Sequence, residues 1–443
     1  MGRFDRSIAT AIRVLVILGF ISLPYTHLRW IPDLGTTRPV SAIFFALAFG
    51  LVALQALAAN RLNWRAWWAW PKTWDGWPVL RWWVGLLGLG ALSAAITPFY
   101  GLPREALTRL IGYLGIFSTL FMAAYSLPRY GIRRIARWTL LGYLPALAYA
   151  LVETAAIFHV AWAASIVLWV RSEIVVDFLW GERISLLATE PSFVAYQLLL
   201  IALLLPYAAE KWLRWPSLLL IALCLVFSQS GMVVVLAATY LVLWGLFSLR
   251  RRILSRLALV TTGFGCAALL ADWLIPGVAA LVNRMAVSIF SVERLRLMSI
   301  SVQIRYHYIL NLVYALWDTR GLGLGIGQYG YFWRAIYQKY IDYRTFDPTG
   351  EVARALSPAG GYMKPWSVLL GVGVDLGVAG LALLAGFLWQ VYRALSGPRQ
   401  RALFFTCLVA LAGAYPIITP HIWLALALMA GIGSAERAGG LAA

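Results

Sequence analysis

Residues 367–391 read SVLLGVGVDLGVAGLALLAGFLWQV, and Asp375 is the only charged side chain among them. A helix that crosses a bilayer needs about 20 mostly apolar residues, so this run is long enough to do so. Similar runs recur along the chain and predict an all-α integral membrane protein with about twelve transmembrane helices. The expected spans are 7–23, 40–59, 82–97, 108–127, 138–160, 191–209, 216–228, 230–249, 257–275, 367–391, 402–418 and 421–436.

The overall composition also indicates lipid as the solvent. Of the 443 residues, 62% are hydrophobic and 12% are charged, and the mean hydropathy is +0.77. Soluble domains are typically about half apolar and about a quarter charged. One soluble core would not hide so many apolar side chains. We therefore expect a single polytopic membrane domain that covers residues 1–443.

The basic residues predict the orientation of the chain. The net charge of +19 reflects 37 Lys and Arg against 18 Asp and Glu. In a soluble protein this would suggest a nucleic-acid partner, but in a membrane protein basic residues collect in short cytoplasmic loops. With twelve spans, the basic connections all fall on the side of both termini, so the N- and C-termini are predicted to be cytoplasmic and no nucleic acid is expected. These connections are 128–137, 250–256, the loop with Arg61, Arg65, Lys72 and Arg81, and the one with Arg393, Arg399 and Arg401.

Two segments are expected to lie outside the membrane on the other side, 161–190 and the long loop 276–366. The long loop holds ten Lys and Arg against five acids. Within it, residues 303–318 carry an apolar stripe that includes Tyr308 and Leu312. This pattern predicts an amphipathic helix on the outer membrane interface. Its polar stripe consists of Gln303, His307, Asn311, Tyr314 and Asp318.

Cysteines and histidines indicate neither a disulfide framework nor a metal site. The three cysteines all lie within apolar runs, and the four histidines are scattered without metal-ligand spacing. We therefore expect no metal and no cofactor. The cysteines are Cys224, Cys266 and Cys407, and the histidines are His27, His159, His307 and His421.

The first candidate site feature is Arg183, followed by Glu190, Pro191 and Ser192 at the start of the expected span 191–209. Pro191 suits the first turn of a helix, and Glu190 lies at the positive end of the helix dipole. The same residues are also typical of an ordinary helix start beside a surface arginine.

The second feature combines Arg305 and Arg320 with the glycine-rich run 321–327, which reads GLGLGIG. A glycine-rich turn can present several backbone N–H groups to an anion, and arginines add charge-assisted bonds to phosphate. The alternative is a flexible turn. A dinucleotide-binding unit is excluded because the preceding segment reads as a helix and no βαβ pattern surrounds the run.

The third feature is Asp375, near the start of the span 367–391. An ionisable residue inside a membrane is costly and is therefore a functional candidate. Glu153, deep in the expected span 138–160, shares this property. The alternative is that such an acid pairs with an arginine for purely structural reasons.

The order of these features resembles the O-antigen polymerase and ligase superfamily of bacterial envelope glycosyltransferases. The resemblance covers roughly residues 180–385, along with the layout of spans and one long loop before the last helices. It is carried by Arg183, by Glu190-Pro-Ser, by Ser228-Gln-Ser-Gly, by Arg305 with the later glycine run, and by Asp375-Leu-Gly-x-x-Gly.

The resemblance implies an enzyme at the periplasmic face of the bacterial cell inner membrane, with 276–366 as its periplasmic loop. Such enzymes transfer a glycan from undecaprenyl pyrophosphate to a sugar hydroxyl without a required metal. Matching position gives Arg183 and Arg305 the pyrophosphate-binding role, and Arg320 joins them by its neighbourhood. Glu190 or Asp375 would accept the proton of the acceptor hydroxyl, and the sequence does not choose between them.

One stretch departs from the ligases of this superfamily. Ligases usually carry a histidine just before the helix with the acid-Leu-Gly pattern, whereas residues 361–367 read GYMKPWS. This favours a polymerase of O-antigen or exopolysaccharide repeats, with an undecaprenyl-pyrophosphate-linked oligosaccharide as substrate. Its candidate partners are membrane lipid, a flippase and a chain-length regulator.

Three alternatives to a polymerase remain open. One is a ligase-like transferase to a lipid A core. From another class, a lipid-linked oligosaccharide flippase would carry charges through the membrane midplane, whereas here they concentrate in the outer loops. A scaffold protein would leave the loop arginines and Asp375 unexplained.

Overall fold

The structure is a computed structural model, and it is nearly all helical. It describes residues 3–31, 38–60, 77–175, 183–188, 191–228, 230–248, 307–340, 365–413 and 419–437. Within these ranges the only β pairing consists of two isolated bridges, His27 with Arg38 and Leu28 with Val175. The all-α fold expected from the apolar runs is therefore confirmed.

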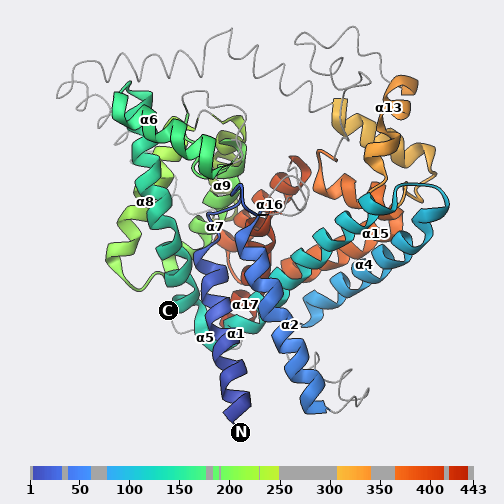
Figure 1. The fold of residues 1–443 in the computed structure, drawn as a ribbon, viewed down its shortest axis with the longest axis horizontal. Coiled ribbons are helices and arrows are strands. Elements are labelled where there is room, and N and C mark those ends of the chain that lie inside the picture. Colours follow the sequence, from blue (N-terminus) through green and yellow to red (C-terminus); the bar gives the residue numbers. More distant parts are fainter. Residues whose placement is uncertain are drawn as a thin grey trace.

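The helices follow the expected spans closely (Figure 1). They are α1 (Arg3–Ile21), α2 (Val40–Asn60), α4 (Trp77–Ile96), η2 (Thr97–Phe99), α5 (Pro103–Ile157), α6 (Ala161–Trp169), η3 (Val170–Ile174), α7 (Pro191–Leu204), η4 (Leu205–Tyr207), α8 (Lys211–Phe227), α9 (Gly231–Ser248), α13 (Tyr329–Tyr340), α15 (Val368–Ala394), α16 (Pro398–Gly413) and α17 (Pro420–Arg437). Residues 307–318 form a further helix.

Five of these elements are long and apolar enough to cross a membrane: Val40–Ala58, Val79–Phe99, Pro103–Ile157, Gly231–Ser248 and Val368–Ala394. This is the composition of a membrane protein. The expected span 257–275 lies outside the described residues, and the count of twelve stays a prediction.

α5 is the central element, and it is two helices rather than one. At Gly131 the backbone takes φ 75° and ψ 153°, which no α-helix contains. Glycine tolerates this conformation because it has no Cβ. The chain therefore turns back at 128–137, and the two halves of α5 contact α1, α2, α4, α6, α7, α8 and α17.

An aromatic cluster joins four of the helices at their centre. The ring of Trp83 on α4 lies 5.0 Å from that of Trp423 on α17 and 6.0 Å from that of Phe387 on α15. Tyr113 on α5 lies 6.1 Å away. Trp83, Tyr113, Phe387 and Trp423 are all buried. Edge-on packing of such rings adds about 0.5–1.5 kcal/mol per pair beyond area burial.

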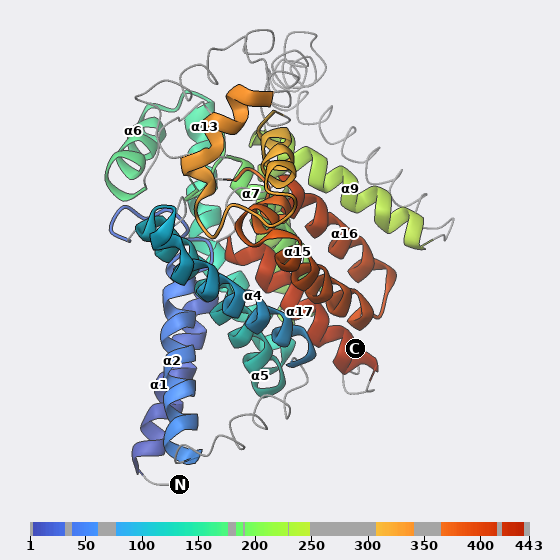
Figure 2. The ribbon, with the colours of Figure 1, turned by 90° about the vertical axis from the view of Figure 1, so that its right-hand side faces the viewer.

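The bundle has two distinct ends. Figures 1 and 2 both show α6 and α13 at the upper end and the start of α1 at the lower end. Side chains near the chain reversal of α5 tie the lower end together: Arg137 pairs with Glu210 at 3.2 Å, and Gln400 donates to Glu436 at 3.2 Å. The described helices α6 and α13, which belong to the segments expected outside the membrane, therefore lie together at the upper end.

The helix 307–318 corrects one expectation from the sequence. Asn311 was assigned to the polar, outward stripe, but it is fully buried. Its Nδ2 donates to the carbonyl of Trp333 at 3.1 Å, and its Oδ1 accepts from the hydroxyl of Tyr329 at 3.0 Å. These bonds attach the helix to α13. Trp317, in contrast, is 77% exposed.

The two ends of the bundle should be distinguishable by chemical labelling in intact cells. We expect a cysteine at Leu322, which is 83% exposed at the upper end, to react with a membrane-impermeant thiol reagent. A cysteine at the exposed Arg133, in the reversal of α5, should react only after permeabilisation, because basic short loops stay in the cytoplasm. A chain with Cys266→Ser is the parent and the control, since Cys266 lies outside the described residues and Cys224 and Cys407 are buried. Labelling at 133 but not at 322 would reverse the orientation.

Candidate functional site

The start of α15 is interrupted at the residues that carry the acid-Leu-Gly pattern. Gly377 takes φ 68° inside the helix, so the helical hydrogen-bond ladder breaks there. The loop 319–328 supplies the missing partners. The amide of Leu324 donates to the carbonyl of Val374 at 2.7 Å, and the amide of Val378 donates to the carbonyl of Gly321 at 2.8 Å. The glycine run and the helix break are therefore one unit.

Asp375 lies at the centre of this unit and is only 1% exposed. Its Oδ2 accepts from Nε of Arg109 at 2.8 Å and from the hydroxyl of Tyr113 at 3.1 Å. Its Oδ1 accepts from the amide of Gly327 at 3.1 Å. One carboxylate thus joins α15, the first half of α5 and the glycine loop. Loss of one partner of such a buried ion pair costs about 3–5 kcal/mol.

Six of the seven amides of the glycine run 321–327 are bonded within the protein, so the run does not offer the several free amides expected from its composition. Gly323 donates to the hydroxyl of Thr319, Ile326 to that of Ser93 and Gly327 to Asp375. The amides of residues 321, 322, 324 and 328 donate to backbone carbonyls. The four glycines have positive φ, from 72° to 95°, so the run is a shaped turn and not a flexible one.

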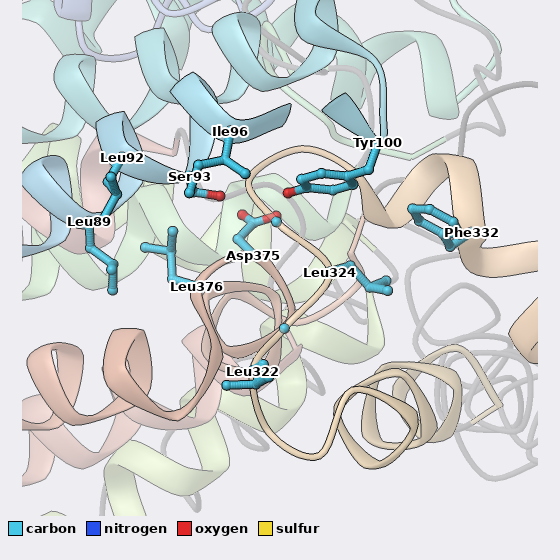
Figure 3. A pocket seen from close by; sticks show the side chains of 12 residues that line it. Leu89, Leu92, Ser93, Ile96, Tyr100, Leu322, Leu324, Phe332, Asp375 and Leu376 are labelled. Atoms are coloured by element: carbon cyan, nitrogen blue, oxygen red, sulfur yellow. The ribbon is translucent and has the colours of Figure 1, made fainter. Parts of the chain in front are cut away.

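A cavity of about 440 Å³ opens beside Asp375, and Figure 3 shows its walls. Leu92 and Ile96 of α4 form one wall, and they are 59% and 48% exposed. The ring of Tyr100 and the Asp375 carboxylate form the polar part (Figure 3). The cavity therefore combines an apolar, outward-facing wall with a small polar floor, which suits an amphipathic ligand.

A second buried ion pair holds the segment that carries Arg183. Glu153, near the end of α5, is fully buried and accepts from Nη2 of Arg171 at 2.7 Å. The same carboxylate accepts from the amide of Ser185 at 3.3 Å and from that of Leu186 at 3.0 Å. The structural alternative for Glu153, a partner arginine, is therefore the arrangement that the structure contains.

Four of the described arginines at the upper end bear on the site, and they differ in whether a buried acid holds them. Arg109 and Arg171 are held by Asp375 and Glu153. Arg183 is half-buried and Arg320 is exposed, and neither makes an ion pair with another residue that the structure describes. Asp318, next to Arg320 in the helix end, is bound instead by Tyr340 and Lys339, and these hydrogen bonds lower the pKa of its carboxyl.

Of the five site residues expected from the sequence, the structure describes three. Asp375 is buried in its ion pair, while Arg183 and Arg320 lie on loops at the upper end. Glu190 and Arg305 lie outside the described residues. The structure therefore leaves the geometry between the two predicted carboxylates untested.

Sequence reasoning missed Arg109 and Arg171. Arg109 lies in the first turns of the expected span 108–127, and a charged residue there should have raised the same suspicion as Asp375. Arg171 follows directly on an apolar run. The sequence alone does not show that Arg109 pairs with Asp375, because the two residues are 266 positions apart.

Among the described residues, no cluster of His, Cys, Asp or Glu has the arrangement of a metal site. Comparison with known proteins adds no identification: no protein-family model matches the sequence, and no curated protein matches it.

The packing of the glycine loop against α15 gives a matched pair of substitutions. Gly323→Ala should destabilise the protein by about 1–3 kcal/mol, because the position has φ 82° and a Cβ would lie 2.7 Å from the Gly377 amide nitrogen. Gly115→Ala, where a Cβ meets no atom within 4 Å, should be neutral or slightly stabilising. Thermal unfolding of the purified variants in detergent tests this. Equal stability of the two variants would contradict the loop geometry.

Proposed function

We propose that the chain is a polymerase of O-antigen or exopolysaccharide repeats at the periplasmic face of the bacterial inner membrane. The observation that carries the proposal is the division of the upper-end arginines. Two of them neutralise the buried acids, and Arg183 and Arg320 have no acidic partner among the described residues. Unpaired guanidinium groups at the outer end of a membrane protein are suited to a lipid pyrophosphate.

In the proposed reaction, a hydroxyl oxygen of the acceptor sugar attacks the anomeric carbon of a lipid-linked donor. The bond between that carbon and the pyrophosphate oxygen breaks, and undecaprenyl pyrophosphate leaves with the bonding electron pair. Its negative charge grows as the bond breaks. Fixed arginines stabilise this charge in a partly dehydrated site, as oxyanion donors do in other transferases.

Under this proposal Arg183, Arg305 and Arg320 bind the pyrophosphate. The proton of the acceptor hydroxyl passes to a carboxylate, and we propose Glu190, which lies outside the described residues, for that step. Both oxygens of Asp375 already accept hydrogen bonds, three in all, from Arg109, Tyr113 and Gly327. Asp375 then acts as a positioning residue for the glycine loop and Arg320.

The cavity beside Asp375 suits the amphipathic character of the donor. Its outward wall of Leu92 and Ile96 on α4 can contact a prenyl chain in the membrane. Its polar floor faces the loop that leads to Arg320. Under this proposal, the apolar tail and the charged headgroup of one ligand would contact neighbouring surfaces.

The test of the function is a reconstituted reaction. Purified protein that receives only undecaprenyl-pyrophosphate-linked repeats should produce a ladder of longer products, because a polymerase uses the same lipid-linked species as donor and acceptor. A ladder that appears only after a lipid A core is added would replace the polymerase with a ligase. Movement of the lipid-linked repeat across vesicle membranes without any new linkage would indicate a flippase.

Arg183, which has no acidic partner among the described residues, gives a second prediction. Arg183→Ala should lower polymer synthesis by at least about 100-fold, the effect of losing one preorganised charge-stabilising donor, with little change in thermal stability. Arg183→Lys should be nearly as damaging if the phosphate contact is bidentate. Arg134→Ala, which removes an exposed arginine at the lower end, is the control and should keep normal activity. Wild-type product length from Arg183→Ala would remove this residue from the site.

A further inference from the structure

A second cavity, of about 340 Å³, lies at the opposite end of the bundle, where α4, α5 and α17 meet. It is separate from the site at Asp375. Its lining consists mainly of small and aliphatic side chains. Gly131, where the helical conformation of α5 is interrupted, forms part of its wall. The lining includes Leu80, Leu120, Ala124, Gly131, Ala427 and Gly431.

The shape of this cavity is elongated along the helices. Its wall on α5 extends from Leu120 to Pro128, and its wall on α17 extends from Ala427 to Ala435. At about 1.5 Å per residue each wall is about 12 Å long. The cavity therefore reaches from the lower end of the bundle well into the apolar part of the protein.

The side chains of the lining favour an apolar filling over water. The hydroxyl of Ser434, the only hydroxyl among the described lining residues, donates to the carbonyl of Ala430 at 2.9 Å. Apolar cavities of even about 150 Å³ stay dry because water finds no hydrogen-bond partners there. An empty cavity of this size would also forfeit the dispersion contacts of its walls. In a membrane protein, the neighbouring apolar material is a lipid acyl chain.

Three arginines are the sequence neighbours of lining residues at the lower end of the bundle. Arg81 follows Leu80, Arg129 follows Pro128 and Arg133 follows Ile132, and all three arginines are exposed. The guanidinium of Arg81 lies 5.3 Å from the ring of Trp82, and that of Arg129 lies 3.7 Å from the ring of Tyr125. Aromatic and basic residues in this combination mark the headgroup level of a membrane.

One acid, Glu436, is adjacent in sequence to the lining, but its carboxylate is bound by residues outside the cavity lining. Glu436 follows Ala435 in α17 and accepts hydrogen bonds from Ser396, Gln400 and Tyr207. The exposed charged residues adjacent in sequence to the lining are therefore the three arginines, which complements a negatively charged headgroup.

We propose that this cavity binds one acyl chain of an anionic phospholipid, whose phosphate is held by Arg81, Arg129 and Arg133. The lipid would brace the chain reversal of α5, where Gly131 leaves the helix ladder broken. This inference concerns a bound membrane lipid and does not rest on the proposed glycosyl transfer.

The experiment uses the purified full-length protein, delipidated in detergent. Phosphatidylglycerol or phosphatidylcholine is titrated in, bound lipid is counted by native mass spectrometry, and the unfolding midpoint is followed in parallel. Phosphatidylglycerol should bind more tightly and raise the midpoint more. Arg129→Gln and Arg133→Gln should each weaken phosphatidylglycerol binding by about fivefold and leave phosphatidylcholine binding unchanged.

The apolar part of the site has its own variant. Ala124→Leu places extra carbon atoms in the cavity and should reduce binding of both lipids. Ala148→Leu, at an exposed position in the second half of the same α5, is the matched control and should bind both lipids as the parent does. Equal binding of the two lipids by the parent, or unchanged binding by Ala124→Leu together with both arginine variants, would overturn the proposal.

Discussion

The ion pair between Asp375 and Arg109 is the interaction on which the upper end of the structure depends. It joins three segments that are far apart in sequence: the first half of α5, the start of α15 and the glycine loop. In a bilayer every backbone polar group must be satisfied internally, so the helix break at Gly377 is possible only with a partner segment. The loop 319–328 is that partner, and Asp375 attaches it to α5.

The same arrangement recurs on the other side of the upper end. Glu153 binds Arg171 and also accepts from two backbone amides of the segment 183–188. A buried pair of this kind contributes little net stability, because the desolvation of two charges offsets most of their attraction. Its effect is to fix one geometry, since any displaced arrangement would leave a charge unpaired. Both loops that carry candidate arginines are therefore held by buried carboxylates.

The sequence predicted the helices well and the site only in part. Spans such as 40–59 and 367–391 correspond to α2 and α15, because length and composition decide whether a segment can cross a bilayer. Asp375 and Glu153 stood out for the same reason, since a charge in an apolar run is conspicuous. Their partners did not, because neither the 266 positions between Arg109 and Asp375 nor the 18 between Glu153 and Arg171 form a local pattern that marks the two residues as a pair. Asn311 was misassigned because a polar residue on a helix faces inward when a second helix supplies its hydrogen-bond partners.

The pairing of the buried acids also determines which arginines can bind an anionic ligand. An arginine next to a carboxylate has little electrostatic attraction left for a ligand, so Arg109 and Arg171 are poor phosphate sites although both lie at the correct end. Arg183 lies on the segment that the Glu153–Arg171 pair holds in place, and Arg320 lies beside the glycine loop that the Asp375–Arg109 pair holds. Their charge is not compensated by any described acid, and Asp318, the nearest in sequence to Arg320, is bound to Lys339 and Tyr340. Buried acids that neutralise the inner arginines thus leave the outer ones available, and a doubly charged leaving group is the kind of ligand that such a surface would stabilise.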